Sequence, residues 1–148
     1  MKNDILQGSS LTILVIDDDE FSRELLREML EQEGLFSVQM ASDGASGLLA
    51  LSDMVCAPDV LICDVYMPNM DGIELLGELA RRRYTGGIIL LSGGDGQMLA
   101  AARTIASAKG LKVLGAFSKP LSYERLLQAM VGETQVKNSA ASLCLSLP

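Results

Sequence analysis

Apolar residues along the chain form two kinds of run that predict β-strands. Continuous apolar runs are typical of strands that are buried on both faces of a sheet. Four such runs occur, namely LTILVI (11–16), VLIC (60–63), GIILLS (87–92) and LKVLGAF (111–117). A fifth segment, FSVQM (36–40), alternates apolar and polar residues, which predicts a strand with one polar face at a sheet edge.

The segments between these strands have apolar residues three and four positions apart, which predicts amphipathic helices. The first helix begins at Glu20 and has Gly34 as its C-cap, and the others cover about residues 45–55, 72–83, a stretch ending near Lys109, and 122–131. Because parallel strands need long right-handed crossovers, this alternation predicts an α/β fold, a doubly wound parallel sheet of five strands with helices on both faces.

Composition and charge narrow the classes of function. The 148 residues are 49% hydrophobic, so we expect one folded domain over residues 11–131, with an N-terminal extension (1–10) and a flexible tail or truncated linker (132–148). The chain has no histidine, which excludes Ser/His/Asp and Cys/His nucleophiles. Its net charge of −7 argues against nucleic acid as a direct partner. The sequence shows no signal peptide or membrane-spanning run, so we expect a cytoplasmic protein without a membrane partner.

Polar residues gather where the predicted strands end, which is where ligands bind doubly wound sheets. Asp17 and Asp18 follow the first strand, and Asp64 follows the third. Carboxylates held close together repel one another, so they either raise each other's pKa or bind a hard cation, for which Mg²⁺ is the natural choice. Ser92 ends the fourth strand and Lys119 follows the fifth, so a hydroxyl and an ammonium reach the same edge. This set of groups suits transfer of a phosphoryl group onto an aspartate.

Four motifs follow one another along the chain, LTILVIDDDE, LICDVYMPNMDG, IILLSGG and GAFSKP. In this order they resemble the receiver domain of two-component response regulators, over about residues 11–131. The resemblance implies a flavodoxin-like sheet in the order 2-1-3-4-5 with five helices. It also implies a signalling protein that catalyses nothing beyond its own phosphorylation and dephosphorylation. A sensor histidine kinase or phosphotransfer protein would supply the phosphoryl group, and the output would be a protein target or a separate or missing output domain.

The resemblance also implies a role for each acidic residue. Asp64 would be the phosphoacceptor, and Asp17 and Asp18 would be the acidic pair that holds Mg²⁺. Asp64 itself and the backbone carbonyl of Tyr66 would complete the metal ligands. Tyr66 is a bulky residue beside the acceptor and opposite the small Gly94, and such flanking positions tune the attack of water on the acyl phosphate in this family.

Near the fifth strand the sequence both follows the family and departs from it. Lys119 matches the lysine that pairs with the phosphate, Ser92 matches the switch hydroxyl, and the bond before Pro120 is expected to be cis. The usual switch aromatic, three residues before the lysine, is replaced by Ala116, and Phe117 comes one residue later. Because side chains alternate along a strand, we expect Phe117 to point to the face opposite Ala116 and to belong to the core.

Residues 92–126 resemble receivers fused to cyclic-di-GMP phosphodiesterase domains, which suggests membership of that subgroup. Two other interpretations of the sequence compete with that of an active receiver. A degenerate receiver would keep the fold and act as an unphosphorylated binding module. A phosphatase of the haloacid-dehalogenase type is the less favoured reading: Asp17 and Asp19 have its DxD spacing, but Phe21 replaces the expected threonine or valine and no suitable acidic ligands follow Lys119.

Overall fold

The computed structural model describes residues 11–32, 34, 36–67, 70–94 and 96–131. The predicted extension (1–10) and tail (132–148) therefore lie outside the described residues. Strands and helices alternate along the described chain. They are β1 (Leu11–Ile16), α2 (Glu20–Glu31), β2 (Phe36–Ala41), α3 (Gly44–Asp53), β3 (Val60–Asp64), α4 (Gly72–Arg81), β4 (Gly87–Ser92), α5 (Gly96–Ala108) and β5 (Lys112–Ser118), followed by helical residues 123–131.

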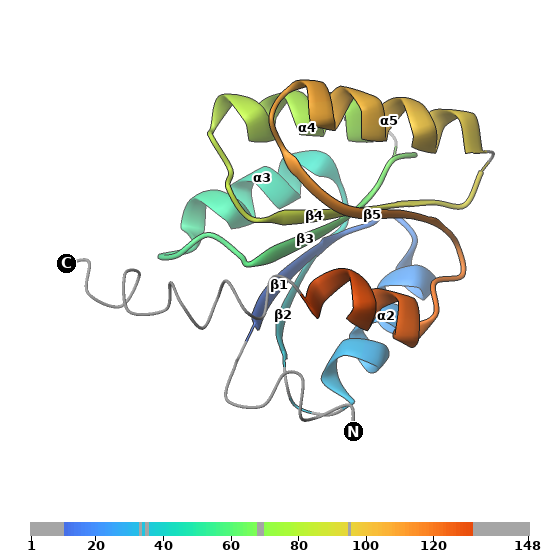
Figure 1. Cartoon of the computed structure of the whole chain (residues 1–148). Coiled ribbons are helices and arrows are strands. Elements are labelled where there is room, and N and C mark those ends of the chain that lie inside the picture. Colours follow the sequence, from blue (N-terminus) through green and yellow to red (C-terminus); the bar gives the residue numbers. More distant parts are fainter. Residues whose placement is uncertain (1–10, 33, 35, 68–69, 95, 132–148) are drawn as a thin grey trace.

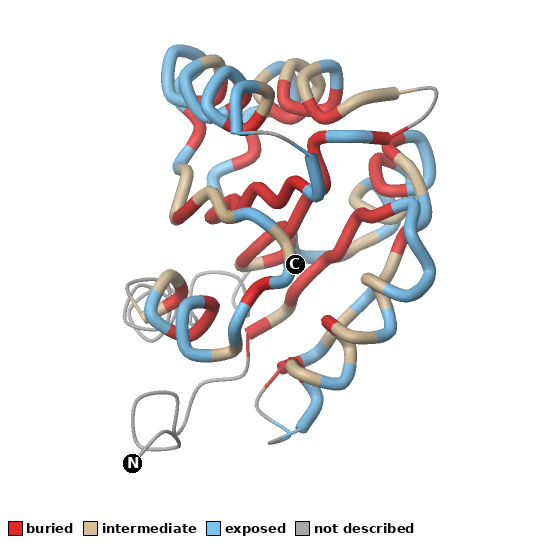
Figure 2. The backbone as a smooth tube through the Cα atoms, turned by 90° about the vertical axis from the view of Figure 1, so that its right-hand side faces the viewer, coloured by how far each residue is buried: buried red, intermediate tan, exposed pale blue. Residues whose placement is uncertain are grey.

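The five strands form one parallel sheet in the order β2-β1-β3-β4-β5, so the predicted fold class and strand order are confirmed (Figure 1). β2 is an edge strand, as its alternating sequence predicts, and Ser37 and Gln39 are exposed on it. The central strands β3 and β4 are buried along their whole length, as continuous apolar runs require (Figure 2).

Helices cover both faces of the sheet, and each face has its own apolar core. On one face α3, α4 and α5 pack through residues such as Leu48, Leu76 and Leu99. On the other face α2 and residues 123–131 pack through residues such as Leu30 and Leu126 (Figure 1). The crossovers place every strand in the same direction, so all five carboxyl ends meet at one edge of the sheet.

Three of the helices begin after a capping aspartate, and two of these end slightly earlier than the sequence predicts. Asp19, Asp43 and Asp71 accept hydrogen bonds from backbone amides of the first turns of α2, α3 and α4. Extended backbone at Met54 ends α3 after Asp53. α4 ends at Arg81, and Arg83 adopts a left-handed conformation with φ of 59° that no regular helix allows.

β5 contains an irregularity that alternation of side chains does not predict. Ile88 pairs with Val113 but Ile89 pairs with Gly115, so Leu114 is an extra residue in this strand. Past the bulge the alternation resumes, and Ala116 packs on the face of α3, α4 and α5 whereas Phe117 packs on the opposite face. The predicted face of Phe117 is therefore confirmed, and its partly buried ring packs against the core on that face. No helix among the described residues is long and apolar enough to cross a membrane.

Candidate functional site

The carboxyl ends of the strands bring the predicted site residues together. Asp17 follows β1 directly, Asp64 and Ser92 are the last residues of β3 and β4, and Lys119 follows β5. Asp17, Asp64 and Ser92 are 1%, 4% and 1% exposed, and they are the buried polar residues of the described chain. A domain buries such groups only where they have partners, so this edge of the sheet is the place where chemistry is expected.

Lys119 joins the two buried carboxylates. Its Nζ lies 2.7 Å from Asp17 Oδ2 and donates a hydrogen bond to Asp64 Oδ2 at 3.0 Å. Burial alone lowers the pKa of the Lys119 ammonium, but its contacts with Asp17 and Asp64 outweigh burial and raise it. Burial raises the pKa of the Asp64 carboxyl, and the Tyr66 amide and Lys119 oppose this rise. The lysine is therefore firmly charged and stabilises the ionised form of a carboxylate that burial disfavours.

Three carboxylates lie close enough to share a cation. Asp17, Asp18 and Asp64 each offer one oxygen, and these oxygens lie within 4.8 Å of one another. Asp18 is exposed, whereas the other two are buried, so the cluster opens to solvent on one side. Hard carboxylate oxygens on an open edge suit Mg²⁺, which keeps several waters when it binds proteins. The donor set thus fits the metal that the sequence predicts.

Backbone amides hold the buried carboxylates in place. Asp17 Oδ1 accepts a hydrogen bond from the amide of Asp19 at 2.9 Å, and Asp64 Oδ1 accepts one from the amide of Tyr66 at 3.0 Å. Each carboxylate therefore uses one oxygen for the backbone and directs the other toward Lys119. Charge-assisted bonds of this kind fix the orientation of a carboxylate more strongly than neutral hydrogen bonds do.

Ser92 connects the ends of β4 and β5. Its hydroxyl accepts a hydrogen bond from the amide of Gly94 at 3.1 Å, and its carbonyl accepts one from the amide of Lys119 at 2.9 Å. The Lys119–Pro120 peptide bond is cis, as the resemblance implies. A change at the Ser92 hydroxyl therefore acts directly on the loop that leads into α5.

Asp19, the second aspartate of the DxD spacing, lies outside the acidic cluster. The Asp19 carboxylate accepts hydrogen bonds from the amide and hydroxyl of Ser22, so it caps α2 and does not join the cluster with Asp17. This arrangement disfavours the interpretation of the chain as a phosphatase.

Sequence reasoning did not identify Arg23, whose Nη1 donates a hydrogen bond to the carbonyl of Asp17 at 2.7 Å. Its position in the first turns of α2, just after the acidic block, was the available signal.

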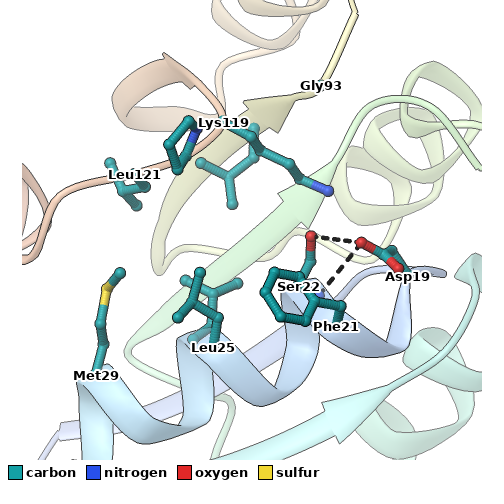
Figure 3. Close-up of a pocket in the computed structure, with 11 residues that line it drawn as sticks. Asp19, Phe21, Ser22, Leu25, Met29, Gly93, Lys119 and Leu121 are labelled. Carbon is teal, nitrogen blue, oxygen red and sulfur yellow. Dashed lines mark hydrogen bonds between the residues drawn. The ribbon is translucent and has the colours of Figure 1, made fainter.

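An apolar hollow of about 320 Å³ lies next to the acidic cluster, between α2 and the segment after β5 (Figure 3). Phe21, Leu25 and Met29 line it from successive turns of α2, and Lys119 and Leu121 lie across from them. Phe21 is 74% exposed. An exposed aromatic ring at the rim of an apolar hollow is typical of a contact surface.

Comparison with known proteins identifies the family. Residues 13–131 match the response regulator receiver domain, so the chain belongs to this family. The response regulator MprA of Mycobacterium bovis is 35% identical over 144 residues, which cover 92% of this chain and 57% of the relative. The chain thus spans little more than half the length of this relative. Receiver domains generally take a phosphoryl group onto an aspartate with Mg²⁺ in an acidic pocket, from histidine kinases or phosphotransfer proteins.

Solved structures agree with this assignment. A receiver domain protein from Clostridium thermocellum has a TM-score of 0.72 at 26% identity, covering 87% of this chain and 98% of that one. A response regulator from Colwellia psychrerythraea has a TM-score of 0.68 at 32% identity over 87% of this chain and 98% of that one. The comparisons do not support the expected cyclic-di-GMP phosphodiesterase subgroup.

Proposed function

We propose that this receiver domain is active and that Asp64 is its phosphoacceptor. The observation that carries the proposal is Lys119, whose ammonium contacts both buried carboxylates, Asp17 and Asp64. A pocket that had lost phosphoryl transfer would have no need of two buried carboxylates and a lysine, because buried charges are costly to keep. This argument favours the active receiver over the degenerate binding module.

In the proposed reaction a carboxylate oxygen of Asp64 attacks the phosphorus of a phosphohistidine. The P–O bond of an acyl phosphate forms while the P–N bond breaks, and the donor imidazole, which is already protonated on its other ring nitrogen, leaves as neutral imidazole. Lys119 remains beside Asp64 and neutralises the phosphoryl oxygens, and the Ser92 hydroxyl donates a hydrogen bond to one of them. Mg²⁺, held by Asp17, Asp18, Asp64 and the Tyr66 carbonyl, would supply further charge neutralisation.

The partners follow from the same chemistry. A histidine kinase or phosphotransfer protein must bring its phosphohistidine to Asp64, and the apolar hollow beside Lys119 offers a surface against which such a partner can pack. We place the reaction in the cytoplasm, where ATP-dependent kinases act. The output is a contact with a downstream protein or with an output domain, made when the loops at Ser92 and Lys119 move.

The test is the intact mass of the protein after incubation with acetyl phosphate, with and without MgCl₂. We expect the wild-type chain to gain one phosphoryl group when MgCl₂ is present and Asp64→Asn to gain none. Asp53→Asn is the matched control, because Asp53 is an exposed aspartate at the end of α3, and it should gain the group like the wild type. A wild-type chain that gains no mass under any condition would favour the binding module.

A further inference from the structure

The three carboxylates of the acidic cluster differ in how they are held. Asp17 and Asp64 are fixed through their side chains, by the backbone amides of Asp19 and Tyr66 and by Lys119. The Asp18 side chain is exposed and has no hydrogen bond or ion pair with any residue that the structure describes. The place of the Asp18 carboxylate therefore depends on the backbone at this point.

The backbone at Asp17 is held from both sides. Its amide donates a hydrogen bond to the carbonyl of Ala41 at 3.1 Å, which ties it to β2. Its carbonyl accepts the hydrogen bond from Arg23 Nη1 at 2.7 Å, which ties it to α2. This carbonyl belongs to the peptide unit that joins Asp17 to Asp18. Because a peptide unit is planar, holding its oxygen also fixes the direction in which Asp18 leaves the strand.

α2 holds Arg23 firmly enough for this task. The amide of Arg23 donates to the carbonyl of Asp19 at 3.0 Å, and the Asp19 side chain caps the same turn through Ser22. A guanidinium is planar and offers its donors in a fixed geometry, so it orients a carbonyl better than a flexible ammonium does. Through Arg23, α2 therefore fixes the backbone of the acidic cluster at Asp17.

We propose that Arg23 is a positioning residue for the metal site: by holding the Asp17 carbonyl it places the Asp18 carboxylate for Mg²⁺. The inference rests on the proposed function, since it assumes that the cluster binds Mg²⁺. Groups that orient metal ligands without touching the metal typically change affinity by about 10-fold to 100-fold when they are removed. Arg23 is such a group in this chain.

The direction in which Mg²⁺ affinity changes distinguishes a positioning role of Arg23 from a simple effect of its charge. Removing a positive charge near a cation site strengthens cation binding by electrostatics alone. Loss of the hydrogen bond to Asp17 should weaken binding instead. Arg27 is the matched control, because it lies one turn further along α2 and is 3.8 Å from Glu24, with no contact to the acidic cluster.

The experiment is a titration of the ¹⁵N-labelled full chain with MgCl₂, followed by NMR at the amides of Asp18 and Tyr66. We expect the Kd for Mg²⁺ to rise about tenfold in Arg23→Met. It should stay the same or fall slightly in Arg27→Met. In the Asp18→Asn background the effect of Arg23→Met should largely disappear, because the carboxylate that Arg23 positions is already absent. Thermal unfolding without Mg²⁺ checks that the two arginine variants are equally folded.

Unchanged or tighter Mg²⁺ binding in Arg23→Met overturns the inference, and so does an equal loss in Arg27→Met or an undiminished loss in the Asp18→Asn background. If Arg23→Met does not fold, Arg23→Lys gives the same test, with a smaller loss expected because charge and one donor remain. A wild-type chain that takes no phosphoryl group and does not respond to MgCl₂ would overturn the proposed function itself. A responsive wild type with an unaffected Arg23→Met overturns the inference alone.

Discussion

The ring of Tyr66 lies directly over the backbone of Gly94. A Cβ at position 94 would come within 2.7 Å of Cε2 of this ring, so the glycine leaves the space that the ring occupies. The ring remains 44% exposed, and the Tyr66 amide is bonded to Asp64. Tyr66 thus lies beside the acceptor in the chain and has an exposed side chain, so we expect this side chain to hinder the approach of water to Asp64.

Replacing Tyr66 with alanine should shorten the lifetime of the phosphorylated state, because water reaches the acyl phosphate more easily. We expect a loss of about tenfold, which corresponds to ~1.4 kcal/mol in the hydrolysis barrier. The free energy of unfolding should change by only about 0.5 kcal/mol, as is usual for exposed positions. Decay of the phosphorylated mass with time measures the lifetime.

Tyr66→Phe is the control for this prediction, since it keeps the ring and should keep the lifetime of the wild type. Gly94→Ala should displace the ring and also change the lifetime, because its Cβ would collide with Cε2. Equal lifetimes for Tyr66→Ala and the wild type would show that the ring does not shield the acceptor.

Which individual residues could be identified from the sequence depended on their position relative to strand ends. Asp17, Asp64, Ser92 and Lys119 could be found because each ends or follows an apolar run. The structure joins the Lys119 ammonium to both carboxylates and the Lys119 amide to the Ser92 carbonyl. Arg23 was not identified, because its contact runs to a backbone carbonyl and only its position just after the acidic block pointed to that contact.

Among the elements, the loop between β4 and α5 is tied to the site through Ser92. The amide of Gly94 is bonded to the Ser92 hydroxyl, and the amide of Lys119 is bonded to the Ser92 carbonyl. If the Ser92 hydroxyl turns toward a phosphoryl oxygen, the bond to Gly94 is weakened and the start of α5 is released. Because the usual switch aromatic is absent, with Ala116 in its place, backbone movement is the expected route of the signal.

Phosphorylation should therefore accelerate hydrogen exchange at the Gly94 amide by about fivefold, the effect of losing a hydrogen bond worth about 1 kcal/mol. Exchange at the buried amide of Ile62 in the centre of β3 should not change, because it lies away from this loop. Exchange measured with and without the phosphoryl group gives the comparison. Ser92→Ala removes the acceptor of the Gly94 bond in both states, so an equal acceleration in that variant would contradict the mechanism.

The existence and order of the elements could be predicted better than their ends. Apolar runs and helical spacing predicted all five strands and the intervening helices, because burial against both faces imposes those periods. The end of α4 could not be predicted, since it depends on the left-handed backbone of Arg83. The bulge at Leu114 was likewise not predictable, because an extra strand residue leaves the apolar run LKVLGAF unchanged.

The buried, ionised Asp64 carboxylate lowers the stability of the whole domain, and this effect depends on pH. Burial raises the pKa of Asp64 above its ordinary value of 3.8. At pH values between the ordinary pKa and the raised pKa of the folded state, Asp64 keeps a proton in the folded state that it has lost in the unfolded state. Stability from this group is therefore fully present below pH 3.8 and is lost as the pH rises through the folded-state pKa. At neutral pH the ionised carboxylate is retained at the expense of stability, as a nucleophile requires.

Asp64→Asn should consequently raise the stability of the domain at pH 7, because it removes the buried charge while Asp17 still pairs with Lys119 at 2.7 Å. We expect Tm to rise by roughly 3 °C, the shift that about 1 kcal/mol produces in a domain of this size. The gain should shrink as the pH falls through the raised pKa of the Asp64 carboxyl, because the wild-type carboxyl then becomes protonated in the folded state. Thermal unfolding of both proteins between pH 4 and 7 without Mg²⁺ measures the difference. Asp53→Asn, which removes an exposed carboxylate, should show no such gain, and a gain that is independent of pH would rule out the buried charge as its source.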